Sequence, residues 1–183
     1  MPTAYVSVVT ETSPRRYEPV RRAACFADLL ESSMASSPAP NPADELAQLR
    51  ALEEKFVLGM NGKDLDSVMS VYDPGESLFV FDVVGPPSAH VGWAEYREAF
   101  RRMFAGISGS LHLALSNFDV EVFGDIAYGC SLQRVSGVHN DGESFDYSVR
   151  VTDVYRKIAG KWLIVQEHLS LPIERETFSP MLH

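Results

Sequence analysis

The chain has 183 residues, 45% of them hydrophobic and 22% charged, which suits one globular domain of ordinary composition. Its formal net charge of −9 argues against nucleic acid or an anionic membrane as a partner, because both attract basic patches. Two cysteines, Cys25 and Cys130, are too few for a disulfide framework or a cysteine-based zinc site. No apolar stretch is long enough for a membrane span or a signal peptide, so we expect a soluble, cytoplasmic protein.

The N-terminal segment differs from the rest of the sequence. Its four arginines and four acidic residues cancel, and residues 32–40 consist mainly of Ser, Ala and Pro, a composition typical of a linker. We therefore expect a tail or linker over residues 1–40, which is either partly disordered, a docking arm, or the product of an overlong start site. A folded domain over residues 41–175 and a short C-terminal tail over residues 176–183 would follow.

Two helices open the predicted domain. Asn41 is a plausible helix cap with Pro42 at the first helical position, and apolar residues then recur at helical spacing up to Asn61-Gly62. A second, shorter helix begins at Asp64 and stops at residues 73–75, where Asp, Pro and Gly occur together.

A strand, a third helix and four long strands complete the predicted order. Residues 77–84 form a buried strand, and a Gly-Pro-Pro turn leads to a helix over residues 93–107 with an aromatic face. Short turns then separate four strands, which are predicted at 111–123, 126–138, 144–157 and 161–171. The fold class is α+β: three N-terminal helices pack on a strongly curved mixed or antiparallel sheet and form a cone-shaped pocket for a small ligand.

Three short runs in this order carry a family resemblance: residues 82–85 (Asp-Val-Val-Gly), 151–156 (Val-Thr-Asp-Val-Tyr-Arg) and 160–162 (Gly-Lys-Trp). With them the sequence resembles the nuclear-transport-factor-2-like, or cystatin-like, superfamily, and within it the SnoaL-like and ketosteroid-isomerase-like branch. The resemblance implies the fold more strongly than any reaction.

The resemblance to ketosteroid isomerases implies an acid–base pair. Asp82 matches their general base and Asp153 matches a second, protonated aspartate that donates a hydrogen bond to the developing oxyanion. Phe56 stands where these enzymes carry a tyrosine, so the third hydroxyl donor is missing. Loss of one such donor costs about 3 kcal/mol of transition-state stabilisation, which argues against a true steroid isomerase.

The last strand supplies two further catalytic candidates. Glu167 matches a position at which related epoxide hydrolases carry an active-site acid, and His168 follows it. Strict alternation would place one set of side chains on one face, namely Leu163, Val165, Glu167 and Leu169, and the other set on the opposite face, namely Trp162, Ile164, Gln166, His168 and Ser170. The pattern leaves open which face lines the pocket.

Aromatic residues are the remaining candidates, as substrate-binding groups. This set consists of Phe56, Tyr72, Trp93, Tyr128, Tyr147 and Tyr155, and each could equally serve core packing. Asp82 could likewise cap the following turn, and Asp153 could form a structural ion pair. His90 and His112 lie far from His168 in the sequence, with no spacing that unites metal ligands, so we predict no metal and no other cofactor.

These observations favour a cofactor-independent enzyme that acts on a small apolar carbonyl compound by proton transfer, of the isomerase, cyclase or hydratase type. Asp82 would be the base, and Asp153 the acid or oxyanion partner. The alternative is a non-catalytic module that binds a small ligand or dimerises. A homodimer is expected in either case, because one face of the predicted sheet has no helix to cover it.

Overall fold

The structure is a computed structural model that describes residues 41–87, 89–177 and 179–180. The predicted tail at residues 1–40 lies outside the described residues. No helix in the described part of the chain is long and apolar enough to cross a membrane.

Three helices precede the long strands: α1 (Pro42–Gly62), α2 (Leu65–Met69) and α3 (Trp93–Ala105). The predicted start of α1 is confirmed, because the Asn41 side chain accepts a hydrogen bond from the backbone N–H of Ala43. Asp64 caps α2 in the same way and accepts from the N–H groups of Asp66 and Ser67.

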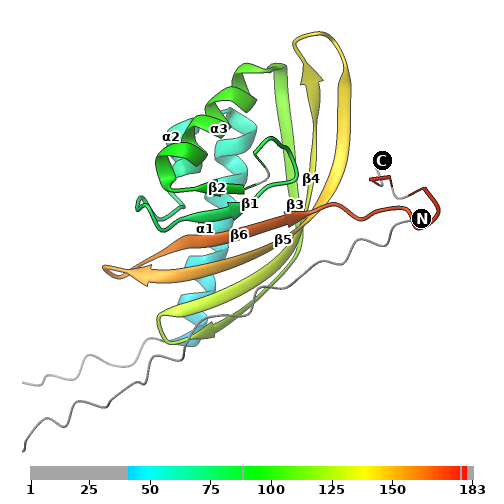
Figure 1. Cartoon of the computed structure of the whole chain (residues 1–183). Coiled ribbons are helices and arrows are strands. Elements are labelled where there is room, and N and C mark those ends of the chain that lie inside the picture. The colour runs from blue at the N-terminus through cyan, green and yellow to red at the C-terminus, as the bar shows by residue number, and fades with distance from the viewer. Residues whose placement is uncertain (1–40, 88, 178, 181–183) are drawn as a thin grey trace, which may run out of the picture. The chain divides into compact units, whose positions relative to one another are not determined.

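Six strands form one mixed sheet in the order β2-β1-β6-β5-β4-β3 (Figure 1). Their bounds are β1 (Phe79–Phe81), β2 (Ala89–Val91), β3 (Ile107–Phe123), β4 (Ile126–His139), β5 (Ser144–Ile158) and β6 (Lys161–Ser170). Strand β1 runs parallel to β6, and the other neighbours are antiparallel. The sheet curls without closing, so the predicted α+β class is confirmed.

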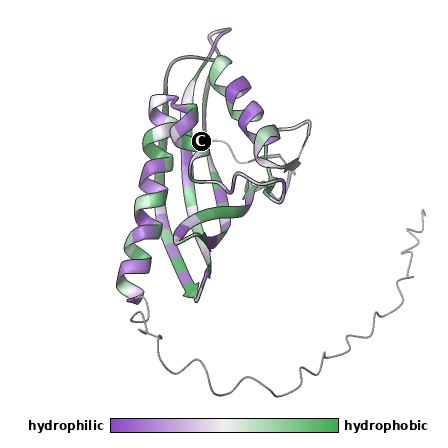
Figure 2. Ribbon diagram, turned by 90° about the vertical axis from the view of Figure 1, so that its left-hand side faces the viewer, coloured by the Kyte–Doolittle hydropathy of each residue, from purple (hydrophilic) through white to green (hydrophobic). Residues whose placement is uncertain are grey.

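The helices cover the inner face of this curled sheet (Figures 1 and 2). Leu49 from α1, Leu78 before β1 and Leu113 from β3 are among the core residues, each at most 2% exposed. Burying such side chains stabilises the fold by about 1.5–3 kcal/mol each. The buried positions of the long strands recur at every second residue, as in β4, where Ala127, Ser131 and Val135 face inward.

The structure adds a strand that was not predicted. His90 lies in β2, which pairs antiparallel with β1, whereas the sequence analysis placed this residue in the turn before the third helix. The strand predicted at 77–84 is reduced to Phe79–Phe81, and Ile107 begins β3 because the helix ends at Gly106.

Strand β6 departs from simple alternation at one residue. Val154 of β5 pairs with Gln166 and Tyr155 pairs with Ile164, so Val165 is an extra residue, a β-bulge. Trp162 and Ile164 therefore face inward together with Glu167. The predicted division of this strand into two alternating faces is wrong, because the bulge shifts the phase of the side chains.

Candidate functional site

A cavity of about 620 Å³ lies between the helices and the inner face of the sheet. Most of its wall is apolar, with Phe56, Phe100, Leu113 and Val149 among the lining residues. The polar side chains on the wall are fewer, namely Asp82, His90, Tyr96, Arg102, Gln133, His139, Tyr147 and Glu167. A mainly apolar cavity of this size with a few polar groups is typical of a small-molecule site.

Strand pairing places three buried ionisable residues in one row across the sheet. His90 of β2 pairs with Val80 of β1, Val80 pairs with Glu167 of β6, and Glu167 pairs with Asp153 of β5. All four residues are at most 3% exposed. This cross-strand row brings residues 80, 90, 153 and 167 together although they are far apart in the sequence.

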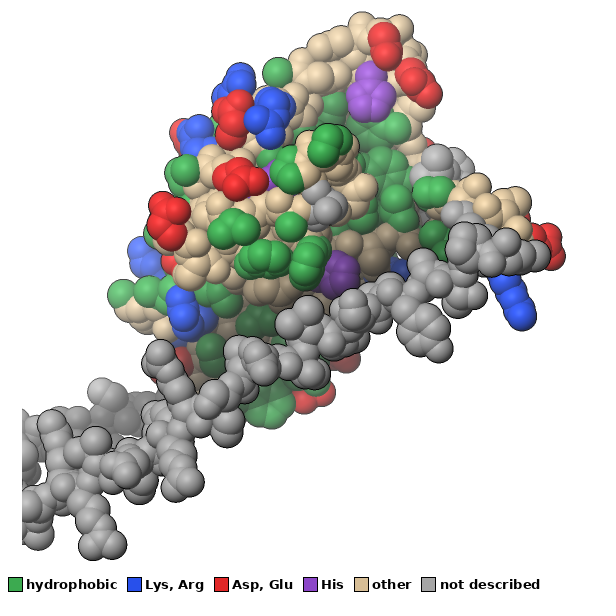
Figure 3. Space-filling model, in the orientation of Figure 1, with side chains coloured by type: hydrophobic (Ala, Val, Ile, Leu, Met, Phe, Trp, Pro, Cys, Tyr) green, Lys and Arg blue, Asp and Glu red, His purple; other side chains and the backbone are tan. Residues whose placement is uncertain are grey.

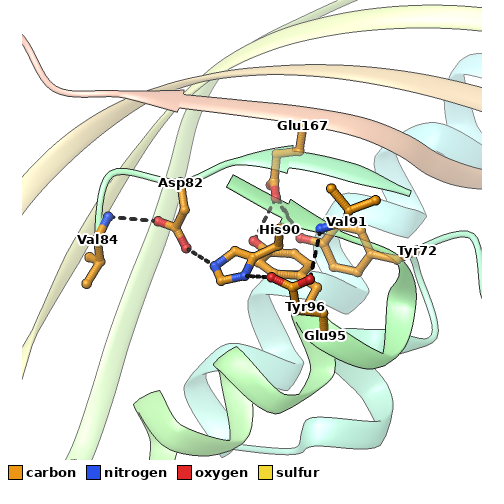
Figure 4. A network of polar contacts seen from close by, with 8 residues as sticks. All are labelled: Tyr72, Asp82, Val84, His90, Val91, Glu95, Tyr96 and Glu167. Carbon is orange, nitrogen blue, oxygen red and sulfur yellow. Dashed lines mark hydrogen bonds and ion pairs between the residues drawn. The ribbon is translucent and has the colours of Figure 1, made fainter. Parts of the chain in front are cut away.

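Glu167 is the acid at the centre of the row. The hydroxyl of Tyr96 donates to its Oε2 at 2.8 Å, and that of Tyr72 donates to the same oxygen at 3.2 Å (Figure 4). Burial, partly offset by the Tyr96 hydrogen bond, raises the pKa of Glu167 to about 8. The carboxyl group of Glu167 is therefore mostly protonated at neutral pH.

Both tyrosines act as hydrogen-bond donors only. Burial and the adjacent Glu167 charge raise the pKa of Tyr72 and of Tyr96 well above the usual range. Their rings also contact each other edge to face, with centroids 5.2 Å apart, which fixes both hydroxyls on the carboxyl group.

His90 lies between two carboxylates beside Glu167 (Figure 4). Its Nε2 is 3.7 Å from Oδ2 of Asp82, and its Nδ1 is 3.2 Å from Oε1 of Glu95. The other oxygen of Asp82 accepts from the backbone N–H of Val84 at 3.1 Å, which orients this side chain after the end of β1. Asp82 and His90 thus form a second acid–base pair on the cavity wall.

A further acidic cluster lies beside the cavity wall. The Tyr155 hydroxyl donates to Oε1 of Glu53 at 2.7 Å and to Oδ2 of Asp153 at 3.3 Å. Burial, with the Glu167 charge second, raises the pKa of Asp153 well above the usual range, and burial also raises that of Glu53. Asp153 is not among the residues that line the cavity.

Residues 49–174 match the SnoaL-like domain, which covers most of the chain. The chain belongs to this family. Comparison of this SnoaL-like domain with curated protein sequences gives no match. Solved structures of nuclear-transport-factor-2-like proteins share its fold.

One similar structure is a protein of unknown function from Pseudomonas putida, 23% identical with a TM-score of 0.68 over 76% of this chain and 95% of that one. A protein provisionally named scytalone dehydratase, from Novosphingobium aromaticivorans, is 12% identical, with a TM-score of 0.64 and coverage of 76% and 94%. A ketosteroid isomerase-like protein from Erwinia carotovora is 20% identical, with a TM-score of 0.59 and coverage of 69% and 95%. At these identities the similarity shows the fold alone.

The SnoaL-like domain brings four of the predicted site residues to the cavity, namely Asp82, Glu167, Phe56 and Tyr147. Tyr72 touches Glu167 without lining the cavity. The predicted pairing of Asp82 with Asp153 does not occur at the cavity, because Asp153 faces Tyr155 instead. On the cavity wall the second acid is Glu167.

Three predicted site residues lie elsewhere. His168 is exposed on the outer face of the sheet, where its ring packs on Phe81 at 5.3 Å. Tyr128 is 42% exposed on the same face, and Trp93 donates its ring N–H to the backbone oxygen of Met69. None of the three lines the cavity.

Sequence analysis missed five polar residues of the wall, and Arg102 and His139 are two of them. His90 was considered only as a metal ligand, Tyr96 looked like one more aromatic residue on the face of α3, and Gln133 was not singled out. One feature of the sequence could have identified these last three. They are polar residues at positions where the helix or strand periodicity predicts an inward-facing, apolar side chain. The described part of the chain holds no group of three His, Cys, Asp or Glu side chains placed to bind a metal ion.

Proposed function

We propose that this domain is an acid–base enzyme that acts on a small apolar carbonyl compound by proton transfer, of the isomerase, cyclase or hydratase type. The observation that carries the proposal is the polar part of the cavity wall. There the mostly protonated Glu167 and the Asp82–His90 pair line one mainly apolar cavity. Groups of opposite proton affinity in one site are what proton transfer beside a carbonyl requires.

The geometry suggests a division of roles. Asp82 would take a proton from the carbon next to the carbonyl group, and the His90 ring, whose Nε2 is 3.7 Å from Oδ2 of Asp82, would help to position the carboxylate. Glu167 would donate its proton to the carbonyl oxygen as the enol forms, while the Tyr96 hydrogen bond holds it in place. Asp82 then returns its proton to carbon, to a different carbon in the case of an isomerase, and the enol hydroxyl returns its proton to Glu167, which restores the carbonyl group and completes the cycle.

Two of the similar structures support this class of reaction by their names, one a dehydratase and one isomerase-like. The absence of a tyrosine at position 56 remains a reason not to assign steroid isomerisation. In this site Tyr96 on α3 would supply the hydroxyl that the first helix lacks.

The direct test is deuterium exchange. Wild-type protein in D₂O should speed deuterium incorporation next to the carbonyl of 4-phenylcyclohexanone, measured by proton NMR. Asp82→Asn should lose most of this activity while still binding the ketone, and the exposed Asp119→Asn, on β3, is the matched control. Exchange at the buffer rate with every ketone in a panel of apolar cyclic ketones would refute the proposal.

The outer face of the sheet supports the expected homodimer, which fits both the enzyme and the alternative, a non-catalytic module. Ile126, Tyr128 and Leu132 of β4 are each at least 40% exposed on the outer face of the sheet, which no helix of the described residues covers. We expect a homodimer through this face, seen by sedimentation equilibrium, with Leu132→Glu shifting it to monomer. A monomeric wild-type protein at all concentrations would contradict this expectation.

A further inference from the structure

Gln133 is a buried polar residue for which the proposed reaction has no use. It lies in the middle of β4, paired with Leu115 of β3 and Val149 of β5, and it is 3% exposed. It lines the cavity among apolar neighbours such as Leu113 and Val135. No hydrogen bond joins its amide to another described residue, and the amide is open to the cavity, unlike the fully buried unpaired atoms of Ser131 and Asp153. A buried amide in an apolar wall is costly unless something in the cavity pairs with it.

Strand register places Gln133 away from the acid–base wall. Glu167 pairs with Asp153, Asp153 pairs with Gly129, and Gln133 lies four residues further along β4. On a flat sheet this is about 10 Å across two strands and about 13 Å along them. The diagonal between the two backbone positions is then about 16 Å. The curl of the sheet and the inward reach of both side chains shorten the span that a ligand must cover, but it still exceeds one ring.

We propose that Gln133 is a second recognition point, and that the substrate is an elongated compound of two or more rings with a neutral polar group at its far end. This inference rests on the proposed function in assigning the ketone end to Glu167. The far group would be a hydroxyl or carbonyl, because an amide can donate to either and accept from a hydroxyl.

The surroundings of Gln133 favour a neutral group over an ion. Its inward-facing neighbours Leu113, Val135 and Val149 offer no counter-ion. Arg102, which also lines the cavity, is half exposed and lies 3.6 Å from Glu98. A charged group at Gln133 would be desolvated without compensation. The size of the cavity agrees, because one ring alone would leave much of about 620 Å³ unfilled.

A matched pair of ligands tests the proposal. 4-(4-Hydroxyphenyl)cyclohexanone and 4-phenylcyclohexanone share the ketone and both rings and differ only in the far hydroxyl. By calorimetry, wild-type protein should bind the hydroxylated compound about fivefold to tenfold more tightly, as one neutral hydrogen bond allows. Gln133→Leu should bring the two affinities together and leave that for 4-phenylcyclohexanone within about twofold of wild type. Gln133→Asn, which shortens the amide, should give an intermediate ratio.

The control is Gln166→Leu, the same substitution on the outward side of β6, which should keep the wild-type preference. Equal binding of the two compounds by wild type, a preference that persists in Gln133→Leu, or no binding of either compound would each overturn the proposal. The deuterium-exchange assay separates this result from the proposed function. Hydroxyl preference without exchange refutes only the reaction, and exchange without preference refutes only the second recognition point.

Discussion

Replacing Glu167 by glutamine should flatten the pH dependence of the protein's stability. The carboxyl group of Glu167 is buried beneath two tyrosine hydroxyls, and burial raises its pKa from 4.5 to about 8. Glutamine has nearly the same shape and can still accept from both hydroxyls, but it does not titrate. The substitution therefore removes the ionisation of this buried group while keeping its shape and hydrogen bonds.

The sign and size of this pH dependence follow from the pKa of Glu167 in the unfolded chain, 4.5, and in the folded chain, about 8. The folded chain holds the proton of Glu167 more tightly than the unfolded chain, so the free energy of unfolding falls by about 1.4 kcal/mol for each pH unit between 4.5 and about 8. This contribution is fully present below pH 4.5, and about 5 kcal/mol of it is lost once the pH exceeds about 8. Wild type should lose this stability on going from acid to alkaline conditions, and Glu167→Gln should not.

Urea unfolding followed by circular dichroism, from about pH 5 to about pH 9, measures the difference between the two curves. Asp153 and Glu53 titrate in both proteins, but the Glu167 charge raises the pKa of Asp153. The difference between wild type and variant therefore reports the ionisation of Glu167 together with its effect on Asp153. Glu54→Gln, at an exposed position of α1, is the control and should follow wild type. Parallel curves for wild type and Glu167→Gln would refute the argument.

Three further variants test other contacts. Tyr96→Phe removes the hydrogen bond that lowers the pKa of Glu167, so this pKa should rise further. The loss of stability should still begin near pH 4.5 but continue to a higher pH than in wild type, and the lost hydrogen bond itself should cost about 1 kcal/mol. Lys157→Met removes the ammonium group that lies 2.6 Å from the buried Glu45 and should cost about 1–3 kcal/mol at neutral pH. The Lys157 hydrogen bond lowers the folded-state pKa of Glu45, so this cost should shrink as the pH falls through that value. Leu113→Ala should cost about 2–5 kcal/mol and weaken ligand binding, because Leu113 is 2% exposed and lines the cavity.

The change in the free energy of unfolding of each variant is measured from urea unfolding midpoints at several pH values. An unmoved titration in Tyr96→Phe would mean that its hydroxyl does not act on Glu167. A cost in Lys157→Met that is the same in acid would remove the ion pair as its cause, with the exposed Lys161→Met as control. A loss well under 1 kcal/mol in Leu113→Ala would mean that the wall collapses to fill the space.

Local signals made most of the fold predictable. Asn41 before Pro42 marks the start of α1, and Ala159-Gly160 forms the last hairpin turn with positive φ at both residues, as its sequence suggests. Such features depend on neighbours in the sequence. The three-residue strand β2 was missed because His90 sits in a short segment that becomes a strand only by pairing with β1.

The site was harder to predict because its parts meet through distant pairings. Glu167 reaches Val80 and His90 only through the parallel pairing of β1 with β6, which no short-range pattern specifies. Asp82 and Glu167 were identified from the resemblance. Asp153 was expected to face the same pocket, yet the position of Tyr155 and Glu53 decides where its carboxyl group points.

The extra residue at Val165 divides β6 into two halves that can change separately. The half before it carries Trp162 and Ile164, which anchor the core, and the half after it carries Glu167, which serves the cavity. Deleting Val165 would turn one half over, exposing either the anchor or the acid, whereas substituting it would leave both facing inward. At this position the number of residues matters more than their chemistry, so a family alignment should be more sensitive to gaps here than to replacements.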